Sequence, residues 1–383
     1  SRYFINADNK GIEPSVKIDI NRNFIINEKK YGKLNGFTLK LDQNVFSHSL
    51  FSLSHVKKSI RNMIEEKVSN FLEAPNDSIN LGNINSINLK EKIKIFWGDE
   101  QIGFLSEGNK IYSPIAEAFN SEYLSSEKKL LVSAKLQNWI DLKIEEELKL
   151  LKNTIDDKIS SQTRAITYNV FEKLGTLQID DFSNFLKNID SESKTTLSKL
   201  GIRIGAKYFF MPNLLKKSSM ELCSVLWSVF NKLSFDGNLP LPKDGRVSFV
   251  PEVEMPKDYW SAIGYINLNN FALRVDVFER IFFLARQKIK SGPFLESAEL
   301  MNPVGCNSDQ LKDILLFCGF SSIKLGDEKK LFYLAPKKQS IKTKKVSKKN
   351  IIIKSKKLKD KKPNLKKIKP DPNSPFAVLE KLL

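Results

Sequence analysis

Apolar residues recur every three or four positions through most of the chain, a spacing typical of amphipathic helices. The longest such stripe runs through 126–159, and its period drifts away from the 3.5-residue repeat of a coiled coil. The pattern therefore predicts one or two long helices packed on the body. Shorter helices are expected over 164–174, 180–186 and 191–200. With small hairpins between them, the expected class is α+β, mostly α-helical and multi-domain.

Two short segments of the first 160 residues match each other. Residues 26–34, INEKKYGKL, and residues 97–105, WGDEQIGFL, both read as strand, polar turn, strand. Such turns favour β-hairpins. A helical pattern follows each hairpin, at 54–72 and 126–159. The interpretation is a domain over 1–160 made of a duplicated hairpin-plus-helix module (24–72 and 93–159), with chance similarity of a short match as the alternative.

The segment 197–230 follows a helical stretch and completes a predicted helical domain over 161–235. Strict alternation through 202–207 predicts a half-buried strand, with Ile202 and Ile204 on the same side. An aromatic run then leads to Pro212, which is expected to open a helix with an apolar stripe from Leu215 to Phe230.

Gly and Pro residues interrupt the helical pattern after 235 and predict a loop and hairpin connection over 236–272. Beyond it, 273–335 reads as three helices followed by a hairpin, with helices at 294–301 and 308–318 and a capping box at the start of the latter. That order predicts a winged-helix-like domain. Its helix 308–318 has an acidic balance and no arginine, which favours a structural role over sequence reading.

The net charge of +18 is unevenly distributed. Residues 336–383 hold 17 lysines against three acidic residues, so they contribute +14 and leave only +4 for the body. Residues 336–370 are predicted to be a disordered Lys-rich linker, and 371–383 a short docking helix that begins near Pro375. Contact with nucleic-acid phosphates is favoured for the linker, while solubilisation or an acidic membrane surface are the alternatives.

Candidate nucleic-acid ligands are cations and aromatic side chains that could line a strand path. For the aromatic side chains, burial in the core is the alternative. The candidates are Arg203, Lys207, Tyr208, Phe210, Lys216 and Lys217 in the body, and Lys344, Lys345, Lys348, Lys349, Lys356, Lys357, Lys361, Lys362, Lys366 and Lys367 in the tail.

Catalytic chemistry is not expected in this chain. There is no Gly-x-x-x-x-Gly-Lys-Ser/Thr phosphate loop, and the two histidines, His48 and His55, are too few for a zinc site. Three cysteines without metal-ligand spacing favour a reducing cytoplasm. No apolar run is long enough to span a bilayer, so no membrane partner is expected. The first residue, Ser1, indicates processing or a piece of a longer protein.

Four segments carry a resemblance to a known family. They are LGIRIG with FFMP, LLK and LW at 200–227, GYINLNNFALRVDVFERI at 264–281, MNPVGCNSDQLKDILLFCGF at 301–320 and DPNSPFAVLEKLL at 371–383. Together they resemble the C-terminal region of a bacterial superfamily-2 helicase family that is similar to the mitochondrial degradosome RNA helicase. The resemblance implies upstream motor domains in the same polypeptide that use ATP and magnesium, and it favours RNA over DNA.

The resulting expectation is an accessory region that binds and guides an RNA or DNA strand, with the basic tail raising affinity. The alternative is a non-enzymatic scaffold that recruits a protein partner through its tail and terminal helix.

Overall fold

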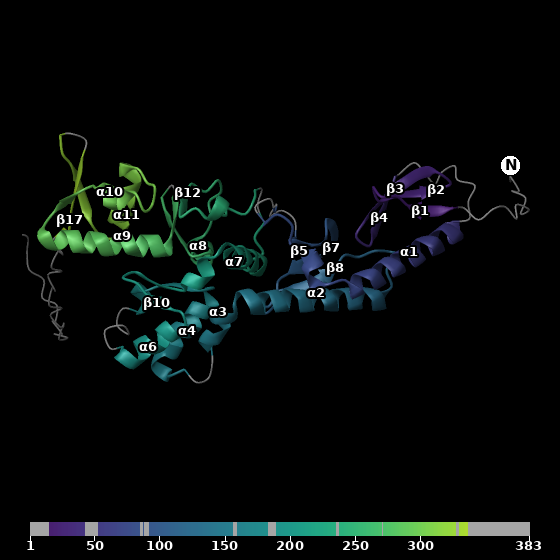
Figure 1. Cartoon of the computed structure of the whole chain (residues 1–383), viewed down its shortest axis with the longest axis horizontal. Coiled ribbons are helices and arrows are strands. Elements are labelled where there is room, and N and C mark those ends of the chain that lie inside the picture. The colour runs from purple at the N-terminus through teal and green to yellow at the C-terminus, as the bar shows by residue number, and fades with distance from the viewer. Residues whose placement is uncertain are drawn as a thin grey trace, which may run out of the picture. The chain divides into compact units, whose positions relative to one another are not determined.

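The computed structural model describes residues 15–42, 53–84, 87, 92–155, 159–182, 189–234, 237–269, 271–326 and 329–335. Helix accounts for about 46% and strand for about 22% of them, with all sheets small and antiparallel, so the fold is of the mixed α+β kind (Figure 1). The tail with its candidate lysines, the terminal segment 371–383, His48 and the side chain of His55 lie outside what the structure describes.

Two four-stranded sheets, each followed by a long helix, make up the N-terminal half (Figure 1). The first has β1 (Val16–Ile18), β2 (Asn23–Ile26), β3 (Lys29–Asn35) and β4 (Thr38–Leu41), followed by α1 (Leu53–Glu73). The second has β5 (Ile79–Asn80), β6 (Lys94–Trp97), β7 (Glu100–Ser106) and β8 (Ile115–Ala118), followed by α2 (Ser126–Glu147). In both sheets the strands are hydrogen-bonded in chain order.

The two matching segments share a glycine, and in both sheets the same steric constraint requires it. A Cβ on Gly32 would lie 2.3 Å from the carbonyl oxygen of Lys40, and a Cβ on Gly103 would lie 2.5 Å from that of Glu117. The pairing register also shifts at the equivalent place, between Phe24 and Ile25 and between Ile95 and Phe96. Both sheets therefore contain the same bulge and the same close approach of strands.

A partly buried group of hydrogen bonds joins the two sheets. The Glu100 carboxylate accepts hydrogen bonds from the backbone N–H of Gly36 (2.9 Å) and from Lys67 Nζ (2.5 Å). The Gln101 N–H donates to Asn35 Oδ1 at 3.0 Å. Gly36 has φ +57° and no room for a Cβ, because the Gln101 carbonyl oxygen lies 2.0 Å from that position. A larger residue at Gly36 would push the two sheets apart.

The next region is helical, but three sequence predictions for it need correction. The elements are α3 (Lys149–Lys152), α4 (Ser161–Glu172), β9 (Thr176–Gln178), α6 (Ser191–Lys199), β10 (Arg203–Ile204), β11 (Tyr208–Phe210) and α7 (Lys217–Phe230). The helix predicted over 126–159 stops at Glu147, because Leu148 leaves helical geometry (φ −109°, ψ 19°), and Ile155 is 45% exposed. Pro212 opens only a 3₁₀ turn, Pro212–Leu215, and Phe230 is exposed.

The third correction concerns the alternation at 202–207. Ile202 is 1% exposed and Ile204 is 37% exposed, so they do not share a buried side. The strand stops after two residues because the chain turns at Gly205, whose N–H donates to the Tyr208 carbonyl oxygen at 2.8 Å. β11 lies between β10 and β9 in a three-stranded sheet.

The C-terminal region continues with short elements. They are β12 (Ser248–Phe249), α8 (Lys257–Ala262), β13 (Tyr265–Leu268), β14 (Phe271–Arg274), α9 (Val275–Lys288), β15 (Phe294–Leu295), α10 (Ala298–Met301), α11 (Ser308–Phe317), β16 (Ser321–Lys324) and β17 (Lys330–Tyr333). Their sheets have the orders β12-β14-β13 and β15-β17-β16. The capping box of Asn307 and Gln310 is confirmed. The helix predicted over 294–301 is wrong at its start, since Phe294 pairs with Phe332 in the second sheet.

Buried apolar side chains form two clusters, and β11 contributes to both. Phe209 lies in the cluster of the two N-terminal sheets and the helical region, while Tyr208 and Phe210 lie in the cluster around α9 and α11. Successive side chains of a strand point to opposite faces, which explains the division. No helix of the described residues has the length and apolar character that crossing a membrane requires.

Candidate nucleic-acid interface

One face of α9 forms the floor of a groove. At about 100° per residue, Arg280, Phe283, Arg286, Gln287 and Lys290 fall within an arc of roughly 120° on the helix and the 3₁₀ turn that continues it. All five line a hollow of about 600 Å³. The opposite face of α9 is apolar and fully buried, so the orientation of the polar face is fixed by the core.

The facing wall of the groove is the short strand β10 and the turn after it. Arg203, Ile204, Gly205 and Ala206 line the hollow from this side. Arg203 and Ile204 are both exposed. Cations from two elements more than 70 residues apart in the sequence therefore share one hollow.

A buried carboxylate ties the wall to the floor. The side chain of Glu279 on α9 accepts hydrogen bonds from the backbone N–H groups of Ala206 (2.6 Å), Lys207 (2.8 Å) and Tyr208 (2.8 Å). Burial raises the pKa of Glu279, and these three N–H donors oppose that rise. A Cβ on Gly205 would lie 2.3 Å from Glu279 Cδ, so the turn needs glycine at this position.

The positive charges of the groove are not balanced by its acidic groups. Of the two carboxylates that line it, Glu279 is occupied by the turn, and Asp276 accepts two hydrogen bonds from Arg274 (2.7 and 3.0 Å). Arg203 and Arg280 have no carboxylate partner within the part of the chain that the structure describes. These two guanidinium groups are therefore available for an anion.

The remaining groove side chains add two more cations and an aromatic ring. The Arg286 guanidinium lies 5.7 Å from the ring centroid of Phe282, and Lys290 Nζ donates to Gln287 Oε1 at 3.0 Å. Neither contact neutralises a charge. Phe283 is 59% exposed, which is unusual for a large aromatic side chain on a helix that otherwise buries its apolar residues. The groove thus combines four cations with one accessible aromatic face.

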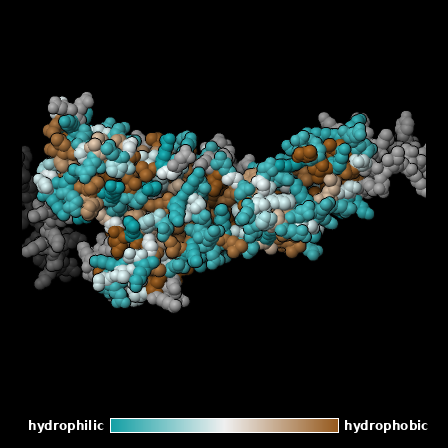
Figure 2. All heavy atoms as spheres, in the orientation of Figure 1, coloured by the Kyte–Doolittle hydropathy of each residue, from teal (hydrophilic) through white to brown (hydrophobic). Residues whose placement is uncertain are grey.

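On the face drawn in Figure 2, hydrophilic residues cover most of the surface and hydrophobic residues appear in scattered patches. A strand of alternating phosphates and bases is recognised by cations beside an aromatic ring, and a broad apolar surface is not required.

Only part of the predicted set of body residues meets in the groove. Arg203 and Phe210 line it, but Phe210 and Tyr208 are each 6% exposed. The Tyr208 ring packs edge-on against Phe278, with centroids 5.8 Å apart, and burial raises its pKa. Base stacking on Tyr208 or Phe210 is therefore incompatible with this conformation, because the core covers their rings.

The predicted lysines of the body lie elsewhere. Lys207 Nζ is 3.7 Å from Asp180 Oδ1, which neutralises part of its charge. Lys216 and Lys217 are exposed at the start of α7 and do not line the groove. The groove residues that the sequence analysis did not name are Arg280, Phe283, Arg286 and Lys290. Their spacing along the α9 sequence was the available signal, since it places them opposite the apolar stripe.

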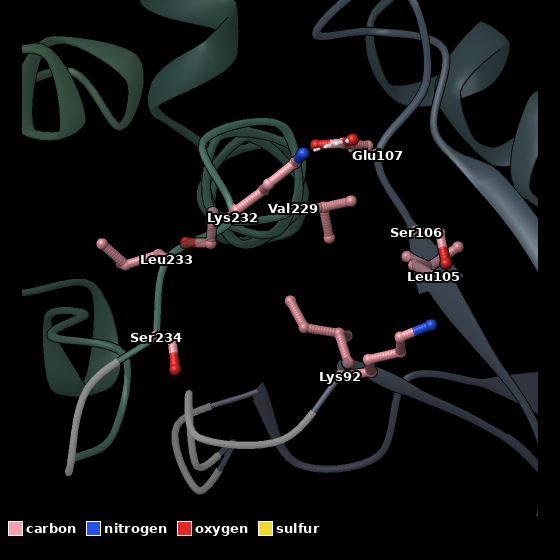
Figure 3. A pocket seen from close by; sticks show the side chains of 10 residues that line it. Lys92, Leu105, Ser106, Glu107, Val229, Lys232, Leu233 and Ser234 are labelled. Atoms are coloured by element: carbon pink, nitrogen blue, oxygen red, sulfur yellow. Dashed lines mark ion pairs between the residues drawn. The ribbon is translucent and has the colours of Figure 1, made fainter.

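A second hollow, of about 360 Å³, lies beside α7 (Figure 3). Leu105, Val229 and Leu233 give it apolar walls. Of its two cations, Lys232 is neutralised by an ion pair, while Lys92 contacts a ring. Lys232 Nζ pairs with Glu107 Oε1 at 2.6 Å, and Lys92 Nζ lies 3.9 Å from the ring centroid of Phe104.

Neither metal binding nor thiol chemistry finds support. Across the described ranges, no three His, Cys, Asp or Glu side chains are grouped so that they could hold a metal ion. All three cysteines are free, and burial raises the pKa of Cys223 to about 12 and that of Cys306 to about 11. These thiols stay protonated at neutral pH.

Comparison of the chain with protein-family models, with curated proteins and with solved structures found no match in any of the three.

Proposed function

We propose that this chain is an accessory region of a nucleic-acid helicase that holds and guides a single strand along the groove between α9 and β10. The observation that carries the proposal is the set of four cations, Arg203, Arg280, Arg286 and Lys290, that line one hollow whose carboxylates are already occupied. RNA is favoured over DNA by the family resemblance of the sequence.

The chemistry of the groove suits a phosphate backbone with unpaired bases. Arginine side chains form strong, charge-assisted hydrogen bonds with phosphate oxygens. Each phosphate neutralised releases counterions, so affinity falls as salt rises. The exposed ring of Phe283 offers a surface on which a base can stack, and this needs a base free of its partner strand.

The C-terminal elements support a winged-helix-like buttress as part of the proposal. Their order, α9-β15-α10-α11-β16-β17, is the order of helices and strands expected of that domain. Its α11 has no arginine, and its Asp309 is paired with Lys330 at 2.5 Å. We therefore place strand contact on α9 and assign α11 a packing role.

The Lys-rich linker and the upstream motor domains complete the proposed function, and both lie outside the described residues. The Lys-rich linker adds sequence-independent phosphate contacts and raises affinity. Motor domains upstream in the same polypeptide supply ATP hydrolysis with magnesium, in the reducing cytoplasm.

The test is the affinity of the chain for fluorescent single-stranded RNA and DNA, measured by anisotropy across a salt series, with and without residues 336–383. Removing the tail is expected to weaken binding and to reduce the salt slope. The shortened chain should still bind, with a slope of roughly 0.7 for each remaining phosphate contact.

Loss of all binding with the tail would refute the groove as a strand site. The scaffold function replaces the proposal if the full chain does not bind nucleic acid and if a protein partner binds the chain only when the terminal helix is present.

A further inference from the structure

We infer that Glu279 is the positioning residue of the groove: its carboxylate fixes the turn after β10 so that Arg203 faces the cations of α9. The inference rests on the proposed function, because it explains how the two halves of the strand site are held in register.

Three consecutive backbone N–H groups converge on this one carboxylate. Those of Ala206, Lys207 and Tyr208 donate to Glu279 at 2.6–2.8 Å. Successive N–H groups that point to one spot form an anion-binding concavity, of the kind that elsewhere binds phosphate. Here the anion is a side chain of α9, so this turn is closed to phosphate and is attached to the helix.

The attachment reaches Arg203 through a short strand. β10 has two residues and, among the described residues, pairs with β11 alone; on its other side the buried Ile202 donates its N–H to the Leu197 carbonyl oxygen, so the Glu279 contact holds the end of β10 that enters the turn. The turn closes through the N–H of Gly205, which donates to the Tyr208 carbonyl oxygen. Without the carboxylate, three N–H groups beside a buried tyrosine lose their acceptor, and the turn has to rearrange to reach water.

Charge alone predicts the opposite effect, which makes the inference testable. Glu279→Gln removes a negative charge from a groove that is proposed to bind phosphates. A through-space electrostatic role therefore predicts tighter binding, whereas a positioning role predicts weaker binding, since Gln offers one acceptor oxygen in place of a carboxylate.

The experiment is a double-mutant cycle on the full chain with R203A, E279Q and R203A/E279Q, using fluorescein-labelled oligouridine in a salt series. We expect R203A and E279Q each to weaken binding roughly 10- to 100-fold, corresponding to one charged hydrogen bond. Each should lower the salt slope by about 0.7. The affinity of the double variant should equal that of whichever single variant binds less tightly.

The matched control is Asp276→Asn, which removes the same charge from the same helix and the same groove. Its carboxylate binds Arg274 and does not touch the turn. We expect D276N to bind as tightly as the unchanged chain or more tightly.

Circular dichroism and a thermal melt check that each variant is folded. If E279Q is unfolded, the cycle is repeated with G205A, which inserts a methyl group between the turn and Glu279 without changing charge. Tighter binding by E279Q, or additive losses in the double variant, would overturn the positioning role.

R280Q/R286Q in the same assay separates this inference from the proposed function. If R280Q/R286Q binds like the unchanged chain, the strand site itself is wrong. If it weakens binding while E279Q and R203A act independently, only the positioning role is wrong.

Discussion

The groove beside α9 and the hollow beside α7 are both lined by lysine or arginine, yet their cations are in different states. In the hollow, Lys232 is paired with Glu107 and Lys92 lies on the ring of Phe104. In the groove, Arg203 and Arg280 form no ion pair with a carboxylate of the described residues, although Asp276 and Glu279 line the same groove. Availability of charge, more than the size of a cavity, therefore marks the better candidate for an anionic ligand.

The difference between the cations of the groove and those of the hollow has a structural origin. The acidic groups near the groove are bound by other parts of the fold: Glu279 by backbone N–H groups and Asp276 by Arg274. Among the described residues, the acidic group near the hollow, Glu107, has Lys232 as its partner and neutralises that lysine. The groove keeps a positive balance because four cations line it against two carboxylates, and these carboxylates are held by other groups than the groove cations.

The largest expected effect comes from reversing two charges in each cavity. R280E/R286E should weaken binding of single-stranded RNA by on the order of 100-fold or more, because two charged hydrogen bonds are lost and two repulsions are gained. K92E/K232E, the same change in the hollow, should alter affinity by less than about 2-fold. Anisotropy titrations at one low salt concentration measure both.

Equal losses in the two double variants would contradict the comparison, because they would show that net charge alone governs binding. Charge reversal at Lys57 and Lys58, both exposed on α1 and lining neither cavity, gives the background effect of lowering the net charge by four.

An intermediate effect is expected at the exposed aromatic residues. Phe283→Ala should cost about 1–3 kcal/mol of binding free energy if a base stacks on the ring, with the salt slope unchanged. Phe230→Ala removes a ring that is 39% exposed at the end of α7 and should leave affinity unaltered. Titration of both variants at two salt concentrations separates stacking from charge.

A fall in the salt slope of F283A would mean that the substitution displaces the arginines of α9. The ring would then be a packing residue and not a stacking surface.

Much of the local structure follows from the sequence because its causes are local. The glycines at 32 and 103 mark the same bulge in two sheets, and the Asn307–Gln310 capping box begins α11 as predicted. Helix ends were less predictable. The stripe through 126–159 continues past Glu147 with the buried Leu148 and Leu151, but the helix is interrupted at Leu148, and no feature of the apolar pattern marks that position.

The site was only partly predictable for a different physical reason. Arg203 is a candidate from the sequence alone. The contact that links its turn to α9 is the hydrogen bond between the Ala206 N–H and Glu279, which lie 73 residues apart. No periodicity in either segment encodes that pairing. Of the two interpretations of the aromatic run at 208–210, base stacking and burial in the core, the structure supports burial, and the two cores on either side of β11 are built from distant segments.

The smallest effect, and the sharpest check on the second hollow, is expected from Glu107→Gln. The Lys232–Glu107 pair is well exposed, with side-chain exposures of 71% and 41%, so its loss should lower the free energy of unfolding by well under about 1 kcal/mol in chemical denaturation. Affinity for single-stranded RNA should stay within about 2-fold, because one released lysine beside apolar walls makes at most one phosphate contact. A clear gain in affinity together with a salt slope steeper by about 0.7 would show that Glu107 masks a phosphate ligand. In that case the hollow would differ from the groove only by one carboxylate, and the groove would no longer be the better candidate for an anionic ligand.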